Sequence, residues 1–391
     1  MIKLYYKDAY MKEFKAKIVK IDGNKIYLDK TAFYPEGGGQ PCDKGMIVGD
    51  NFEFVVEDVQ KEGNYIAHIG HINGDSKIKI GSVKGKIDWV RRYNFMQQHT
   101  GHHILAASIL KLLHSHVFGS IIFDNINKME FKYSGNLKNY IRSLESLANG
   151  AVWSAMPVKT KIYNSKKDAI LENVELRKKP KENITGPIRI VKIGNFDAVP
   201  CAGTHVKNSS EVGIIKITNF YRKTKDIWRV EFLCGFKALN YINNILNDYR
   251  AASSYLNTKS YNIADIIKGK LDEFNILKKE LIETKAELIK SNVICENGFC
   301  SYFGNLNMKE MEKISILLLN KNNVILLASK KGYLLIAKNK NYNFDINKIT
   351  NEIKHEFGGN GGGSSIMIRL GGIKNIENAF DYALDLLRND L

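Results

Sequence analysis

Short runs of alternating apolar and polar residues fill the first 90 residues of the chain. In the stretch KAKIVKIDGNKIYLDKTAFYP (residues 15–35), two such runs flank the turn signal DGN, which predicts a β-hairpin. Three further runs show the alternation of half-buried strands at close spacing: NFEFVVEDV (51–59), YIAHIGHI (65–72) and SVKGKIDW (82–89). Residues 1–90 are therefore predicted to form a small β-barrel, with a sandwich as the alternative.

A helical pattern replaces this alternation from residue 93 onward. Apolar residues recur at helical spacing over 93–113 and again over 137–155, where Met156-Pro157 ends the second helix. Strands are predicted in PIRIVKIGNFDAVPCAGTHV (187–206), EVGIIKITNFYR (211–222) and IWRVEFLCG (227–235). Helices beside antiparallel strands predict an α+β core over residues 91–236.

Two further regions complete the predicted organisation. Residues 237–294 carry a heptad of apolar residues within mixed charge, which predicts a helical hairpin or a short coiled coil, with an ordinary amphipathic core helix as the alternative. The apolar positions are Ile267, Phe274, Leu281 and Leu288, with Leu271 and Leu277 between them. Residues 295–391 combine two buried strands, a glycine loop, a further strand and a closing helix, which predicts a separate α/β domain. The expected fold class is a multidomain α+β protein with domains over 1–90, 91–236, 237–294 and 295–391.

Composition narrows the class of protein. The 391 residues include 58 basic and 41 acidic side chains, a net charge of +17, which is compatible with a polyanionic partner, nucleic acid first, and equally with a lysine-rich proteome or a solvated basic surface. No apolar run approaches the roughly 18 residues of a membrane span, so no membrane partner is expected. Five cysteines are too sparse for a disulfide framework, and the default location is the cytoplasm.

Two pairs of metal-ligating residues have the same short spacing. His99 and His103 are four residues apart, so a helix places both imidazoles on one face, whereas His102 points elsewhere. Taken alone, this pair also fits surface or packing histidines. Cys201 and His205 form a second pair, again four apart, across a turn that contains glycine. Two histidines, a thiolate and a third histidine make a suitable ligand set for zinc.

Five stretches of the chain carry a resemblance to a known family. QQHTGHHIL (97–105) and PCAGTHVKNSSEVGIIKI (200–217) resemble the two zinc-binding motifs of alanyl-tRNA synthetase editing domains. Three more stretches resemble other parts of the same synthetases, in the same order: TAFYPEGGGQPCDKG (31–45), GSIIFDNINKMEFKYS (119–134) and GGNGGGSSIMIRLGG (358–372). Only 30 residues precede the first of these, so no aminoacylation domain is expected. The chain is identified as similar to free-standing editing proteins of the AlaX type that retain the C-terminal domain.

The resemblance implies an activity and a metal. The activity is the hydrolysis of tRNA(Ala) that carries serine or glycine, and the zinc ligands are His99, His103, Cys201 and His205. Four protein ligands fill a tetrahedron, whereas catalytic zinc keeps a position open. We therefore expect three firm ligands and one exchangeable position, with His205 as the weakest ligand because it ends the loop. A tRNA-binding protein with a structural zinc and vestigial hydrolysis is the alternative function.

The resemblance also suggests substrate-binding residues. Glycines allow close approach of the backbone and present amide donors, although a tight turn between strands is an equal alternative. Thr100 is expected to orient substrate or water, with a place on the helix surface as the alternative. The full set of expected substrate-binding or orienting residues is Gly37, Gly38, Gly39, Gln40, Asp43 and Thr100. Two residues depart from the family pattern: Ala202 replaces a glycine, which we expect to be tolerated, and Val117 replaces a frequent glutamine that is able to hydrogen-bond substrate.

Contacts with tRNA are expected at two places. Arg91 and Arg92 precede the zinc helix and are expected to meet the acceptor end, with barrel-surface charge as the alternative. In the C-terminal domain, a glycine-rich stretch allows close backbone approach to RNA: Gly358, Gly359, Gly361, Gly362 and Gly363. Its GGGSS ending lacks the Gly-Lys-Ser/Thr of a nucleotide phosphate loop. A homodimer through the coiled coil or the C-terminal domain is a further expectation.

Overall fold

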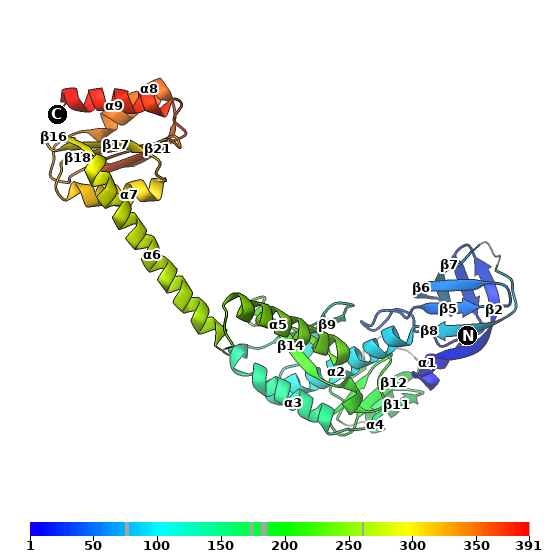
Figure 1. The fold of residues 1–391 in the computed structure, drawn as a ribbon. Helices are drawn as coiled ribbons and strands as arrows, with labels where there is room; N and C mark the ends of the chain where they lie inside the picture. Colours follow the sequence, from blue (N-terminus) through cyan, green and yellow to red (C-terminus); the bar gives the residue numbers. More distant parts are fainter. Residues whose placement is uncertain (75–77, 173–174, 181–185, 260–261, 391) are drawn as a thin grey trace. The chain divides into compact units, whose positions relative to one another are not determined.

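The computed structural model describes residues 1–74, 78–172, 175–180, 186–259 and 262–390. The chain divides into two compact units, an N-terminal unit of residues 1–250 and a C-terminal unit of residues 251–391 (Figure 1). Both units mix helices with strands, as the sequence predicts. The four domain boundaries expected from the sequence remain predictions within these two units.

The N-terminal unit begins with a closed six-stranded barrel in the order β2-β3-β7-β6-β5-β8. Its strands are β2 (Glu13–Asp22), β3 (Lys25–Leu28), β5 (Gly45–Val48), β6 (Glu53–Glu62), β7 (Tyr65–Ile72) and β8 (Ser82–Ile87). A short helix, α1 (Leu4–Lys7), and the parallel pair β1 (Ile2–Lys3) and β4 (Lys30–Thr31) lie beside them. β2 and β3 pair antiparallel and form the predicted hairpin. Alternate residues of β2 and β8 are buried, as expected for the strands of the predicted barrel.

A long central helix, α2 (Trp89–Leu113), follows the barrel. It begins four residues before the predicted position because the Asp88 side chain accepts a hydrogen bond from Arg91 N at 3.0 Å and caps its first turn. It ends as predicted, where His114 adopts a left-handed conformation with φ of 51°. Most of α2 between residues 95 and 109 is buried, since it packs against β9, β13, β15 and α3.

Two sheets and several helical segments follow α2 in the described part of the N-terminal unit. One sheet has the order β14-β15-β10-β9 and the other β11-β12-β13. The strands are β9 (Val117–Ile122), β10 (Asn127–Lys132), β11 (Val158–Tyr163), β12 (Ile188–Ile193), β13 (Asp197–Pro200), β14 (Ile215–Arg222) and β15 (Ile227–Cys234). The helical segments are η1 (Leu137–Asn139), α3 (Ile141–Trp153), α4 (Lys166–Glu172) and η2 (Ser209–Val212). This α+β arrangement positions the end of β13 against the middle of α2.

Two long helices occupy the region in which the sequence predicts a coiled coil. They are α5 (Gly235–Tyr255) and α6 (Ile263–Asn292). The last turns of α6 bury Ala286 and Ile289 against the C-terminal sheet and α7 (Met308–Leu319). The heptad positions are exposed in the single chain: Ile267, Leu271, Phe274, Leu277, Leu281 and Leu288.

The C-terminal unit is an α/β domain with helices on both faces of a six-stranded sheet. In sheet order, the strands are β16 (Ile294–Glu296), β17 (Phe299–Gly304), β18 (Val324–Ser329), β19 (Tyr333–Lys338), β21 (Met367–Gly371) and β20 (Asn360–Ser364). One face packs against α6 and α7, and the other against α8 (Ile346–Phe357) and α9 (Ile376–Asp390), as Figure 1 shows. A disulfide between Cys295 and Cys300 joins β16 to β17, which the sparse cysteines did not predict.

The predicted glycine loop of the C-terminal domain is wrong in part, because its centre is the edge strand β20. Gly358 and Gly359 follow the end of α8 with positive φ, but Gly361 and Gly363 pair with β21. A Cβ on either strand glycine would lie 2.0 Å from a backbone oxygen of β21. The glycines are thus required by the close approach of two strands.

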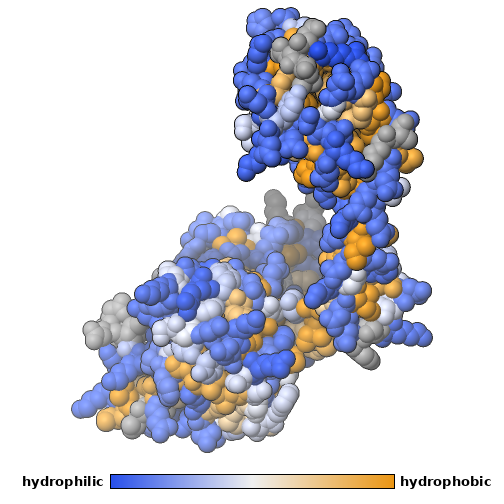
Figure 2. Space-filling model, turned by 90° about the vertical axis from the view of Figure 1, so that its left-hand side faces the viewer, coloured by the Kyte–Doolittle hydropathy of each residue, from blue (hydrophilic) through white to orange (hydrophobic). Residues whose placement is uncertain are grey.

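Hydrophilic residues cover most of the face drawn in Figure 2, with hydrophobic patches between them. Among the helices of the described residues, none combines the length and the apolar character needed to cross a membrane.

A buried histidine inside the barrel makes the fold sensitive to acid. His68 Nδ1 donates to Ile26 O at 2.9 Å, and Nε2 accepts from Thr31 Oγ1 at 2.8 Å. The ring is fully buried, and desolvation lowers the pKa of His68 from 6.5 to about 4. The unfolded chain therefore binds the proton more tightly than the barrel does.

We expect His68 to destabilise the protein as the pH falls from about 6.5 to about 4, by about 3 kcal/mol, while its contribution is constant above pH 6.5. The measurement is the free energy of unfolding in urea across this pH range for the wild type and for His68→Gln, which keeps a donor and an acceptor but does not titrate. The variant is expected to show the flatter pH dependence. Parallel curves for the two proteins would contradict this assignment.

Candidate metal centre

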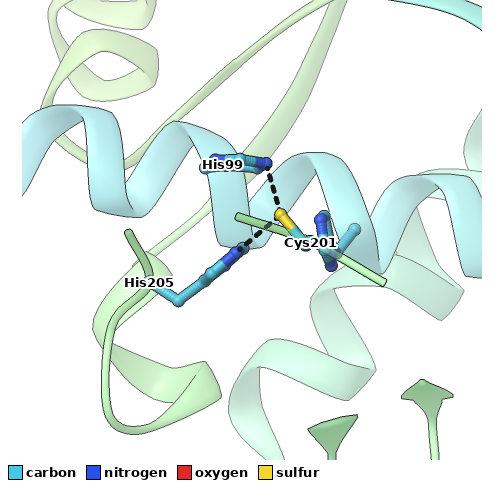
Figure 3. Close-up of side chains that lie close together, drawn as sticks. His99, Cys201 and His205 are labelled. Atoms are coloured by element: carbon cyan, nitrogen blue, oxygen red, sulfur yellow. Dashed lines mark hydrogen bonds between the residues drawn. The ribbon is translucent and has the colours of Figure 1, made fainter. Parts of the chain in front are cut away.

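Four predicted ligands lie together in the N-terminal unit. One ligand atom of each side chain lies within 4.8 Å of the others: His99, His103, Cys201 and His205. The Nε2 atoms of His99 and His205 lie 3.3 and 3.4 Å from Cys201 Sγ (Figure 3). A nitrogen and a sulfur on one zinc ion are at most about 4.4 Å apart, the sum of the two bonds. Both distances therefore fit a single ion.

Two segments supply these side chains. The helix α2 presents His99 and His103 one turn apart, and the loop after β13 presents Cys201 and His205, as Figure 3 shows for three of them. The three imidazole rings converge, with centroid distances of 4.5, 4.7 and 5.1 Å. The spacing in the sequence predicts each pair, but only the packing of β13 on α2 brings the pairs together.

The barrel orients the first histidine. His99 Nδ1 lies 2.8 Å from the side-chain oxygen of Gln40, and the Gln40 amide nitrogen donates to Thr204 Oγ1 at 2.8 Å. Gln40 Oε1 also accepts from Thr204 N at 3.1 Å. A hydrogen bond at Nδ1 selects the tautomer in which Nε2 is free to bind a metal. Gln40 is therefore a positioning residue for His99 rather than a group that faces water.

The helix itself orients His205. Thr100 Oγ1 lies 3.1 Å from His205 Nδ1 and accepts from Val206 N at 3.2 Å. Thr100 is completely buried, so the expected contact with substrate and the alternative helix-surface position both conflict with its place in the structure. Its physical role is to hold the loop and to direct His205 Nε2 toward the cluster.

Sequence reasoning missed the carboxylate behind the third histidine. Asp197 Oδ2 lies 3.7 Å from His103 Nδ1, a buried atom without a hydrogen-bond partner among the described residues. Arg177 donates to both oxygens of Asp197, at 2.7 and 3.1 Å. This arrangement leaves His103 Nε2 for the cluster. The one available signal was the position of Asp197, four residues before Cys201, at the start of the short strand that leads into the loop with Cys201.

A second unpredicted arginine orders the loop that carries Cys201. Arg189 Nη1 donates to the carbonyls of Cys201 and Gly203, each at 2.9 Å. Its guanidinium also lies 5.3 Å from the centre of the Tyr6 ring. A Cβ on Gly203 would lie 2.1 Å from the His99 ring, so only glycine fits at this position. Ala202 is exposed and has no positive φ, which is why an alanine is accommodated there.

Burial sets the protonation states of the cluster. It lowers the pKa of His99 to about 3, with a contribution from the positive charge of Arg189. It also holds the pKa values of His103 and His205 well below 6.5, so all three imidazoles are neutral. Burial raises the pKa of the Cys201 thiol, and Arg189 opposes this increase. A bound cation would favour the thiolate, the form that ligates metals.

Two residues expected to bind substrate or tRNA are structural instead. Arg92 and Asp43 are both buried and form an ion pair between α2 and the barrel. Arg92 also donates to the carbonyls of Ala9, at 2.7 Å, and Ala32, at 2.6 Å. These contacts contradict the prediction that Arg92 meets tRNA and the alternative of barrel-surface charge, because the guanidinium has no exposure. They equally contradict a substrate-orienting role for Asp43.

The glycine run before Gln40 is a tight turn. Gly37 and Gln40 exchange backbone hydrogen bonds of 3.1 and 3.0 Å, and Gly38 and Gly39 have φ of 60° and 79°. Gly39 O accepts from Ile122 N at 3.1 Å, which fixes the turn against β9. The turn carries Gln40 to His99, and a direct contact between these glycines and substrate stays a prediction.

Other predicted residues lie away from the cluster. Arg91 donates to Cys42 O at 3.0 Å and pairs with Asp124 at 2.9 Å, so its contact with tRNA stays a prediction. The glycines of residues 358–363 belong to the C-terminal unit. His102 is outside the cluster, with both ring nitrogens buried and lacking partners among the described residues. Val117 begins β9 and lines a groove at that end of the strand.

We expect Gly203→Ala to abolish stoichiometric zinc binding, because the added methyl group displaces the His99 ring. Ala202→Gly, the adjacent change in the same loop, is the matched control and is expected to retain one zinc ion per chain. The measurement is zinc content by atomic absorption after gel filtration. Equal zinc content in both variants would refute the close contact.

Removal of the Gln40 side chain is expected to weaken zinc binding by about 10- to 100-fold, because His99 loses its orienting acceptor. Gln40→Glu retains an acceptor oxygen and is expected to retain more of the affinity than Gln40→Ala. Competition with a chromophoric chelator measures both constants. An affinity of Gln40→Ala equal to that of the wild type would show that the contact does not act on the metal.

Two protein families match parts of the chain. Residues 4–91 match the family described as tRNA synthetases class II (A). Residues 188–231, which include Arg189, Asp197 and the loop with Cys201 and His205, match the threonyl and alanyl tRNA synthetase second additional domain.

Curated relatives match a larger part. The alanyl-tRNA editing protein AlaX-L of Pyrococcus horikoshii is 37% identical over 404 residues, covering 100% of this chain and 99% of that protein. The alanine–tRNA ligase of Pyrococcus abyssi is 31% identical over 390 residues, which cover 96% of the chain but 42% of the ligase. That of Pyrobaculum aerophilum is 34% identical over 294 residues, 73% of the chain and 32% of the ligase. The chain therefore belongs to the family of AlaX-type alanyl-tRNA editing proteins.

Proposed function

We propose that this protein hydrolyses tRNA(Ala) that carries serine or glycine in place of alanine, with zinc as its metal. The observation that carries the proposal is the cluster of three neutral imidazoles and one thiol in a chain of the AlaX-type family. The scissile bond is the ester between the amino acid and the terminal ribose. When bound, zinc supplies a Lewis acid that polarises a carbonyl or activates water.

The protein's own residues hold the four ligands in place. Gln40 and Thr100 direct two imidazoles toward the thiol, and Arg189 fixes the loop that carries it. These hydrogen bonds form within the fold, so the ligands are arranged before substrate arrives. Such preorganisation reduces the rearrangement that catalysis requires.

A catalytic metal needs an exchangeable position. The contacts do not favour His205 as the weakest ligand, because Thr100 holds its Nδ1. His103 is the better candidate, since its Nδ1 has no hydrogen-bond partner among the described residues and Asp197 lies 3.7 Å away. We therefore assign the loosest ligand to His103.

The choice of substrate follows from its hydroxyl group. A site that hydrogen-bonds a substrate hydroxyl discriminates strongly against an analogue without it. Alanine lacks this group, so correctly charged tRNA would be spared. Glycine also lacks it, and we expect serine to be removed faster than glycine.

The tRNA partner fits the net charge of +17 and a surface outside the metal centre. The exposed backbone of β20 offers close approach to RNA in the C-terminal unit. The exposed heptad of α6 offers a dimerisation surface.

Deacylation of Ser-, Gly- and Ala-tRNA(Ala) tests the proposal. The wild type is expected to release serine and glycine but to spare alanine. Cys201→Ala, which removes a metal ligand, is expected to lose at least about 100-fold in rate. Cys42→Ala, a buried free cysteine outside the cluster, is the control and is expected to remain active.

If the protein binds tRNA but hydrolyses none of the three aminoacyl-tRNAs, a second function replaces this proposal. That function is tRNA binding with a structural zinc, and the complete set of four protein ligands is the observation that favours it.

A further inference from the structure

A groove lies at the start of β9, outside the metal centre. It has a volume of about 470 Å³ and runs between the first residues of the strand and residues 176–179. Its apolar lining comes from Val117, Leu176 and Phe118, and Phe118 is 52% exposed. An exposed aromatic ring beside a groove is a stacking surface for an unpaired base.

The charged lining of the groove is entirely basic. Lys178 and Lys179 are exposed and form no ion pair within the described part of the chain, whereas Arg177 is bound to Asp197. Among the described residues, none that lines the groove is acidic. Lysine side chains without ion-pair partners attract phosphates, and an apolar surface beside them accepts an aromatic ring. Single-stranded nucleic acid offers both phosphates and unpaired bases.

Two contacts link the groove to the metal centre. Arg177, which lines the groove, binds Asp197, and Asp197 lies 3.7 Å from His103. Arg177 N also donates to Ala198 O at 2.9 Å, so the basic segment is held on the backbone of β13. Only Asp197 therefore lies between Arg177, in the wall of the groove, and the expected metal ligand His103.

The strand β9 connects the groove to the glycine turn. Its first residues line the groove, and Ile122 at its other end donates to Gly39 O. The distance along the strand is about 16 Å at 3.3 Å per residue, a length that a few unpaired nucleotides span. β9 is also the edge strand of its sheet, and the glycine turn contacts its far end.

We propose that this groove binds the single-stranded 3′ segment of the tRNA, with a base stacked on Phe118 and phosphates at Lys178 and Lys179. The inference rests on the proposed function for the identity of the RNA. It explains the position of Val117, which lines this groove as an apolar surface instead of offering a hydrogen bond.

Binding of a short fluorescent single-stranded RNA that ends in CCA tests the proposal, measured by anisotropy with the full-length, zinc-loaded protein. Phe118→Ala is expected to raise Kd about tenfold through loss of stacking. Lys178→Ala/Lys179→Ala is expected to raise Kd and to reduce the slope of log Kd against log salt by about 1.4, the value for two phosphates of a single strand.

The control is Lys15→Ala/Lys17→Ala, which removes the same charge from exposed positions of β2 and is expected to leave both Kd and the salt slope unchanged. Zinc content reports whether each variant is folded. The groove variants are also expected to raise the KM for Ser-tRNA(Ala) about tenfold.

Wild-type affinity in both groove variants would overturn the proposal, and so would an equal loss in the barrel control, which would indicate a general charge effect. Because the RNA-binding measurement needs no hydrolysis, it separates the groove from the activity. An inactive protein that binds RNA through Phe118 would refute the proposed deacylation alone. An active protein whose groove variants bind as the wild type does would refute the groove alone.

Discussion

A buried ion pair between Asp43 and Arg92 joins the barrel to the central helix, and the metal centre depends on this contact. Neither side chain is exposed to solvent, so each charge needs full compensation within the protein. The carboxylate accepts from Tyr34 N as well, and the guanidinium also donates to Ala9 O and Ala32 O. A buried pair satisfied in this way specifies one arrangement of the two parts, because removal of either partner leaves an uncompensated charge.

The ion pair between Asp43 and Arg92 fixes the position of Gln40 relative to α2. Gln40 lies three residues before Asp43, at the end of the glycine turn, and its side chain reaches His99 on α2. A residue next to the barrel thus accepts a hydrogen bond from the Nδ1 side of His99, a ligand that belongs to the helix. Thr100 and Asp197 stand behind the other two histidines, from the helix and from β13. Hydrogen bonds from two segments therefore orient His99 and His205, whereas His103 has only the nearby charge of Asp197 behind it. Such support of the ligands tunes both metal affinity and ligand basicity.

The two units use glycine for different physical reasons. In the N-terminal unit, Gly203 leaves space for the His99 ring, and a methyl group there would overlap it. In the C-terminal unit, Gly361 and Gly363 allow β20 to approach β21 closely, so a stretch that resembles a flexible loop is an edge strand. Edge strands with exposed backbone are available for pairing or for ligands. Composition alone does not distinguish these uses, because both depend on which atoms lie opposite.

Local pattern determined much of this protein before any tertiary contact was known. Alternation predicted the barrel strands, helical spacing predicted α2, and the two pairs at four-residue spacing predicted the ligands, because these features depend on backbone periodicity. Tertiary structure alone decided the roles of Arg92, Asp43 and Thr100, which the sequence placed at a substrate or RNA surface and the fold buries. Tertiary structure alone also placed Arg177, Asp197 and Arg189 beside the metal ligands. Packing decides whether a side chain is buried and which distant residue it contacts. The residues that neighbour it in the sequence do not determine either property.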